Sequence, residues 1–155
     1  MRTFVDSIVR ALRCRRGNAM IEFAIGAGVL TSVFAGTFQF GYTFYQYNLL
    51  KNAVSDGARY ACLRTYDSST STPSSAFQTA VQNMVVYGNP GGGSSPVAPG
   101  LATSNVNLNV TFTNSVPTAM TVSITGYTIG AVFDTTTLNN KPSVTYAYQG
   151  IYSPY

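Results

Sequence analysis

The stretch Arg15-Arg16-Gly17-Asn18-Ala19-Met20-Ile21-Glu22-Phe23 joins a basic N-terminal segment to a long apolar run. No charged residue occurs from Phe23 to Leu50. As a helix rising roughly 1.5 Å per residue, residues 24–47 can cross a hydrocarbon core about 30 Å thick. A core helix of a soluble protein would seldom lack charge over this length. We therefore predict one transmembrane helix over about 24–47.

The distribution of charge predicts the orientation of this helix. Residues 1–17 contain five arginines and one aspartate and so carry the whole formal net charge of +4. Positive residues remain on the cytoplasmic side of a membrane, so the N-terminus should be cytoplasmic and the C-terminal domain periplasmic or extracellular. The rest of the chain is neutral and has no basic stripe or RNA-binding motif, so we expect no nucleic-acid partner.

Small side chains recur every fourth position within the predicted span, at Ala24, Gly28, Ser32 and Gly36. This spacing places them on one helix face, along which a second helix can approach closely. We predict that this face packs against a partner helix. The alternative is that lipid simply tolerates these residues.

Three interpretations of the N-terminus compete. A secretory signal peptide could be cleaved near Val33-Phe34-Ala35, but the apolar run continues beyond that point. A twin-arginine signal could use Arg15-Arg16, although the residues that usually follow such a pair are missing. A prepilin peptidase could cleave after Gly17, which would make Asn18 the first residue and Glu22 the fifth. The processing residues would then be Gly17, Asn18, Glu22 and Phe23.

The segment from Gly17 to Ile25 resembles the start of TadE-like pseudopilins, the minor pilin-like proteins of tight-adherence (Flp, type IVb) pilus systems. Lys51-Asn52-Ala53-Val54-Ser55-Asp56-Gly57-Ala58-Arg59-Tyr60-Ala61 is similar to a second block of that family. The resemblance covers about 17–61. The chain departs from the family's pattern at Gly28, Gln39 and Tyr42, where proline, glutamate and arginine respectively are common.

The resemblance implies an inner-membrane protein whose partners are a prepilin peptidase, other pilin-like subunits and membrane lipid. It also implies that Glu22 pairs with the N-terminal ammonium of a neighbouring subunit. A carboxylate inside a membrane is costly, which favours such pairing. Recognition by the peptidase is the alternative role for Glu22.

For the chain as a whole, we predict an α+β protein with three parts. A basic leader, residues 1–17, would be cleaved. A pilin-like helix would follow over 18–65, and an extracytoplasmic domain over 66–155. Within the domain, the apolar period predicts a short helix over 76–87, ending at Gly88, and then a flexible loop over 88–100.

Later in the domain the apolar period changes to two. The alternating residues are Val106, Leu108, Val110 and Phe112, then Met120, Val122 and Ile124, and finally Val144, Tyr146 and Tyr148. This pattern predicts three or four antiparallel strands with one buried face. The helix at 76–87 is the expected cover for that face.

The composition argues against catalysis. Histidine is absent, the carboxylates after the leader are few and scattered, and Cys62 has no imidazole base. We therefore expect no enzymatic activity, no cofactor and no metal site. A pseudopilin subunit and a single-span surface binding protein outside any pilus remain as the two hypotheses.

Overall fold

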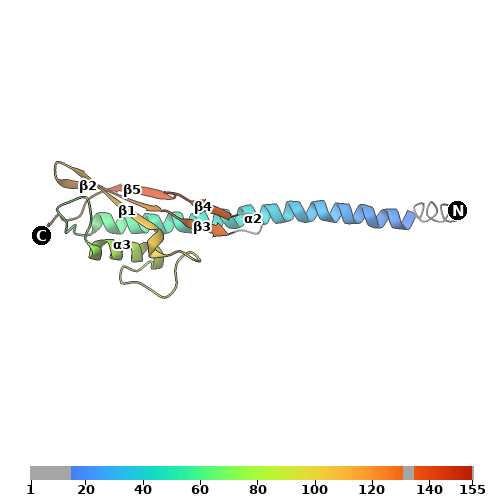
Figure 1. Cartoon of the computed structure of the whole chain (residues 1–155), viewed down its shortest axis with the longest axis horizontal. Helices are drawn as coiled ribbons and strands as arrows, with labels where there is room; N and C mark the ends of the chain where they lie inside the picture. The colour runs from blue at the N-terminus through green and yellow to red at the C-terminus, as the bar shows by residue number, and fades with distance from the viewer. Residues whose placement is uncertain (1–14, 131–134, 155) are drawn as a thin grey trace, which may run out of the picture. The chain divides into compact units, whose positions relative to one another are not determined.

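The computed structural model describes residues 15–130 and 135–154. They divide between Gly41 and Tyr42 into two compact units. The main elements in chain order are helix α2 (Arg15–Leu63), helix α3 (Ser75–Tyr87), a 3₁₀ turn η1 (Thr103–Asn105), and strands β1 (Val106–Thr113), β2 (Val116–Ile124), β3 (Tyr127–Gly130), β4 (Thr135–Leu138) and β5 (Ser143–Ala147) (Figure 1). This is the α+β class that the sequence predicts.

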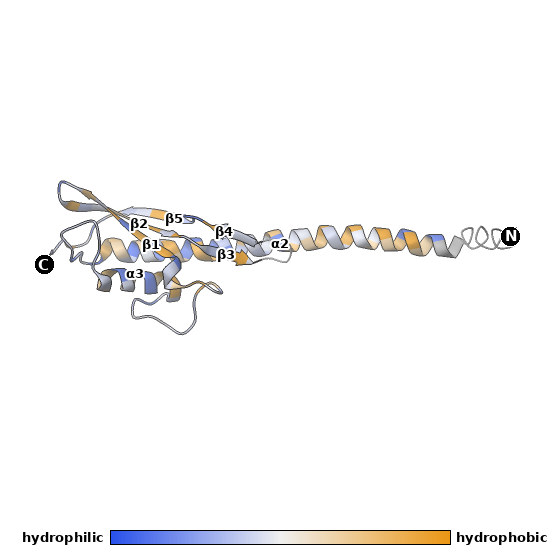
Figure 2. Ribbon diagram, in the orientation of Figure 1, coloured by the Kyte–Doolittle hydropathy of each residue, from blue (hydrophilic) through white to orange (hydrophobic). Residues whose placement is uncertain are grey.

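Helix α2 contains the predicted span and continues well beyond it. Its residues Asn18–Leu63 are long and apolar enough to cross a membrane, and the most apolar window has none of its residues buried. Orange and pale colours accordingly dominate the N-terminal part of α2 (Figure 2). The helix contains no proline, which explains why it is uninterrupted. It fits a single-span membrane anchor.

Helix α3 begins and ends where its sequence signals lie. The Ser74 hydroxyl accepts a hydrogen bond from the backbone N–H of Phe77 at the N-terminus. At the C-terminus Gly88 adopts φ 68°, and its N–H donates to Met84 O. A side chain at Gly88 would be strained in this left-handed conformation, so glycine is the favoured residue here.

The strands form two antiparallel sheets, one in the order β1-β2-β5 and the other pairing β3 with β4. A two-residue turn joins β1 to β2, with Asn114 and Ser115 at φ 52° and 62°. Positive φ at both positions suits the right-handed twist of a hairpin. The larger sheet corresponds to the three predicted runs. The β3–β4 hairpin is additional.

Two helices, not one, cover the buried face of the larger sheet. On the β1 side, Gln82 of α3 donates to Val106 O at 3.3 Å. On the β5 side, the Ser55 hydroxyl of α2 shares a 3.1 Å hydrogen bond with the Tyr146 hydroxyl. The α3 helix was expected to cover the sheet, and α2 shares that role because its own apolar face extends past the span.

Helices and strands both contribute buried side chains to the core of this domain. Its fully buried large side chains are Tyr66, Phe77, Leu50, Met120, Ile124, Val54, Val81, Val85, Val86 and Val122. Burial of a side chain of this size contributes roughly 1.5–3 kcal/mol. The C-terminal part of α2 is therefore an integral element of the domain core.

Residues 151–153 are hydrogen-bonded to Tyr66, which follows the end of α2. Backbone Tyr66 N–H donates to Ile151 O at 2.9 Å, and Ser153 N–H donates to Tyr66 O at 3.0 Å. The Tyr66 ring makes edge-to-face contacts with Phe77 and Phe112. These contacts make Tyr66 the centre of an aromatic cluster that closes this end of the domain.

The loop over 88–100 has neither helix nor strand, and it is attached at several points. The Val97 N–H donates to Val86 O at 2.8 Å, and the Asn83 amide donates to Pro90 O at 3.3 Å. Ala98 is fully buried. The second half of the loop thus contributes to the core.

Candidate functional site

The predicted processing residues lie on the N-terminal turns of α2. Gly17 is within the helix, and Asn18, Glu22 and Phe23 are exposed. Phe23 is 77% exposed, although it is a large apolar side chain. Because they occupy successive turns of one helix, Asn18 and Glu22 lie four residues apart on the same face. Cleavage after Gly17 stays a prediction.

The four small residues of the predicted packing face, Ala24, Gly28, Ser32 and Gly36, are all exposed. A Cβ atom added at Gly28 or at Gly36 would meet no atom within 4 Å. The Ser32 hydroxyl donates to Gly28 O at 2.9 Å, so its polarity is satisfied within the helix. The face is therefore exposed and built of small side chains, and its packing against a partner helix stays a prediction.

The second family-like block packs inside the domain. Gly57, Ala58 and Ala61 are buried on the side of α2 that faces the core. A Cβ atom at Gly57 would collide with Cγ2 of Val85 on α3. Glycine at this position allows the two helices to approach closely. Its role in this block is thus structural.

A polar cluster lies on the side of α2 that faces β5. The Arg59 guanidinium lies 5.9 Å from the centre of the Tyr146 ring, a cation–π geometry. Hydrogen bonds from Ser55 and Arg59 lower the pKa of the Tyr146 phenol, and the hydrogen bond to Tyr146 raises the pKa of Arg59. The Ser55 hydrogen bond and the Arg59 contact with Tyr146 fasten β5 to α2.

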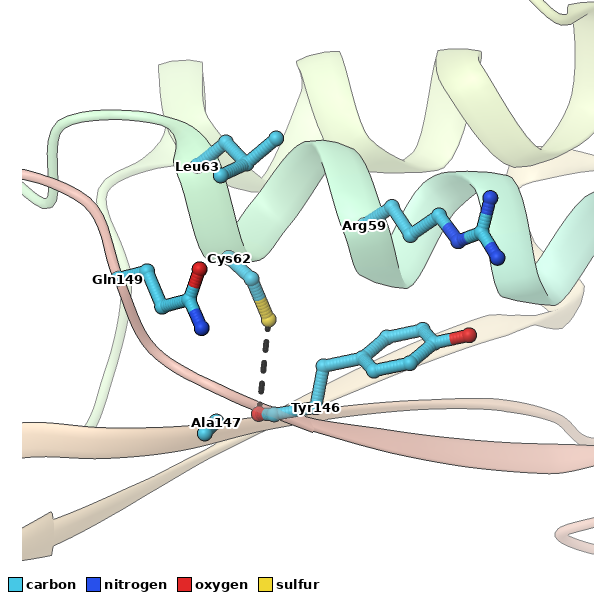
Figure 3. A pocket seen from close by; sticks show the side chains of 6 residues that line it. All are labelled: Arg59, Cys62, Leu63, Tyr146, Ala147 and Gln149. Atoms are coloured by element: carbon cyan, nitrogen blue, oxygen red, sulfur yellow. Dashed lines mark hydrogen bonds between the residues drawn. The ribbon is translucent and has the colours of Figure 1, made fainter.

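A pocket of about 340 Å³ opens beside this cluster, lined by Arg59, Cys62, Leu63, Tyr146, Ala147 and Gln149 (Figure 3). The Cys62 thiol points toward β5 and donates to Tyr146 O at 3.5 Å. Burial raises the pKa of the thiol. A buried thiol with a raised pKa is a poor nucleophile.

A second pocket lies between α2, Pro99 and β3. It measures about 180 Å³ and is lined by Tyr42, Gln46, Pro99, Tyr127, Thr128, Ile129 and Gly130. Gln46 is only 3% exposed. The sequence pattern could not identify this pocket, because it joins Tyr42 and Gln46 of α2 to Pro99 and β3, which are distant in sequence. Across residues 15–130 and 135–154, no cluster of acidic, histidine or cysteine side chains could hold a metal ion.

Comparison with protein families confirms the resemblance drawn from the sequence. Residues 17–59 match the family model described as TadE-like protein. Over this segment the chain is similar to pilin-like proteins associated with tight-adherence pili. No curated protein matches the chain. No solved structure matches it either.

Proposed function

We propose that this chain is a minor pilin-like subunit of a tight-adherence pilus or secretion system, cleaved after Gly17 by a prepilin peptidase and assembled with other pilin-like subunits in the inner membrane. The observation that carries the proposal is the match over 17–59. That segment includes both the proposed cleavage junction and the small-residue face.

The exposure of α2 supports a role in assembly. Its most apolar window has no buried residue, so lipid or other helices must cover it in the cell. The exposed side chains include Leu30, Val33 and Phe34, each more than 60% exposed. The regular small-residue face gives part of this surface a shape suited to a helix rather than to lipid chains.

Cleavage would change the environment of Glu22. It would create a free ammonium on Asn18, one helical turn from the Glu22 carboxylate, and it would leave the first backbone N–H groups of the helix without intrahelical acceptors. A negative charge is stabilised near a helix N-terminus. An ammonium on the same or a neighbouring chain would stabilise it further in a medium of low dielectric constant.

The mature N-terminus tests this proposal directly. Mass spectrometry of the chain from membranes should give a mass that begins at Asn18. Gly17→Val should leave a heavier species that retains the leader. A mature chain that begins at Met1 or at Gly36 would overturn the proposed processing and favour a membrane-anchored surface binding protein.

Glu22 is tested separately by its incorporation into pilus fractions. Glu22→Ala should be processed normally and yet be depleted from those fractions, because the proposed partner of the ammonium is lost. Ile25→Leu, a change without charge at an exposed position three residues later, serves as the control. Normal incorporation of Glu22→Ala would reject the pairing role and leave the cleavage unaffected.

A further inference from the structure

The pocket lined by Gln46 contains a buried carbonyl oxygen for which the described residues supply no hydrogen-bond donor. The Gln46 Nε2 group donates to the Tyr42 hydroxyl at 3.0 Å. The Oε1 atom of the same amide is buried and has no hydrogen-bond partner among residues 15–130 and 135–154. A buried carbonyl oxygen nearly always has a donor, so a donor from outside the chain is expected at this point.

The other walls of the pocket favour a cation as that donor. Two of the residues that line it, Tyr42 and Tyr127, are aromatic. The Tyr127 hydroxyl donates to Pro99 O at 2.7 Å, so its oxygen retains lone pairs as acceptors. Aromatic side chains and oxygen lone pairs attract an ammonium group. None of the described residues that line the pocket is an arginine or a lysine, which would oppose a cation.

The Tyr42 hydroxyl, by contrast, can donate a hydrogen bond to a ligand in this pocket. The Tyr42 oxygen accepts the bond from Gln46, so its own hydrogen is available for an acceptor. A ligand with an ammonium beside an anionic oxygen would satisfy both Gln46 and Tyr42. Phospholipid headgroups with a primary amine have this arrangement.

The position of the pocket along the chain identifies the source of such a ligand. Gln46 and Tyr42 lie at the far end of the predicted span, 24–47, in a region rich in aromatic residues that suit the headgroup zone. We propose that this pocket binds the primary ammonium headgroup of a zwitterionic membrane phospholipid, with Gln46 Oε1 as the principal acceptor. The inference rests on the membrane anchoring in the proposed function but does not depend on cleavage after Gly17.

Native mass spectrometry of the full chain in detergent micelles tests the proposal. Phosphatidylethanolamine, phosphatidylcholine and phosphatidylglycerol with identical acyl chains would be offered at equal concentration, and free ethanolamine in a separate sample. We expect at least fivefold greater retention of phosphatidylethanolamine, because the trimethylated amine cannot donate a hydrogen bond and the glycerol headgroup has no cation. Equal retention of the three lipids would overturn the proposal. Binding of free ethanolamine at comparable concentration would overturn the assignment to a lipid.

Three variants identify the acceptor. Gln46→Leu should abolish the preference for phosphatidylethanolamine, whereas Gln46→Glu should increase it, since a carboxylate accepts hydrogen bonds and adds a negative charge. Asn48→Leu, at an exposed position two residues later, should leave the preference unchanged. The Gln46→Glu variant keeps the test decisive even if the leucine variant folds poorly. A weaker preference in Gln46→Glu would contradict the proposal. The mass of the mature N-terminus is independent of all these results, so failure here is distinguishable from failure of the proposed processing.

Discussion

The thiol of Cys62 illustrates how one residue's environment decides its chemistry. It is 4% exposed, it donates to Tyr146 O, and burial raises its pKa. Only the thiolate reacts rapidly with alkylating reagents. In a Cys14→Ser background, we therefore expect iodoacetamide at pH 8 to modify Cys62 many times more slowly in the folded protein than in urea. Mass spectrometry over time gives both rates.

A cysteine at an exposed position of the same helix provides the control for this measurement. Leu63→Cys in a Cys14→Ser, Cys62→Ser background places a thiol on a neighbouring residue that is 69% exposed. It should react in the folded protein at nearly its rate in urea. Equal folded-state rates for the two thiols would show that Cys62 is accessible after all.

The raised pKa of Tyr66 predicts that the domain becomes less stable at alkaline pH. Burial raises its pKa to about 12, above the ordinary value of about 10. The folded state therefore favours the neutral phenol, and this contribution is complete below pH 10 and is lost as the pH rises toward 12. The free energy of urea unfolding in detergent, followed by circular dichroism, should fall over this range.

The Tyr66→Phe variant isolates that contribution. It removes the titrating phenol and also the hydrogen bond from Tyr66 to Thr70 O at 2.8 Å. We expect a loss of about 0.5–1.5 kcal/mol at pH 8 and a shallower decline between pH 10 and 12. Tyr45→Phe changes a tyrosine that is 59% exposed and should leave the decline unchanged. A decline in Tyr66→Phe as steep as in the unchanged chain would assign the effect to other groups.

At the scale of elements, the sequence predicts those whose pattern is long and regular. The apolar run of α2 and the alternating residues of β1, β2 and β5 are of this kind. The β3–β4 hairpin was missed because β4 reads Thr135-Thr-Thr-Leu138 and has almost no apolar alternation. Its pairing depends on contacts with β3, where Tyr127 and Ile129 are buried, and no local pattern reports those contacts.

The candidate sites show the same limit. The residues at 17–36 could be proposed from sequence because each depends only on its position along one helix. The clusters around Tyr146 and Gln46 could not, since each joins α2 to a segment distant in sequence. Ser55 and Tyr146, for example, are 91 residues apart. Only the three-dimensional pairing of strand and helix brings them together.

Contact between α2 and α3 gives a prediction at this scale. Alanine at Gly57 would collide with Val85, and overpacking of this kind typically costs 1–3 kcal/mol. The gain in helix propensity offsets about 1 kcal/mol. We expect Gly57→Ala to reduce the free energy of unfolding by up to about 2 kcal/mol, measured by urea titration in detergent.

A matched glycine separates packing from propensity. Gly41 also lies in α2, but a Cβ atom there would meet nothing within 4 Å. Gly41→Ala should therefore leave stability unchanged or raise it. The double variant Gly57→Ala, Val85→Ala should recover part of the loss by removing the colliding methyl group, and no recovery would argue against this contact as the cause.

At the scale of the whole molecule, the two parts of α2 lie in different environments. From Tyr42 to Leu63 it contributes to the domain core, and between Asn18 and Gly41 its side chains are largely exposed. Substitutions in these two parts should therefore have separable effects. Changes in the first part should alter the stability of the domain, and changes in the second should alter assembly while the domain remains folded.

The small-residue face provides the sharpest test of this separation. Leucine at Gly28 and Gly36 would fill the face along which a partner helix is proposed to approach, since an added Cβ atom at either position meets no other part of the described chain within 4 Å. We expect the Gly28→Leu, Gly36→Leu variant to reach the membrane, to be processed normally and to keep the urea midpoint of its domain, but to be depleted severalfold from crosslinked complexes and pilus fractions. Gly26→Leu is the matched control, because Gly26 is equally open and lies roughly 200° around the helix from Gly28. Equal depletion of both variants would mean that leucine disturbs the span wherever it is placed. Full incorporation of the double variant would mean that another face of α2 makes the contact.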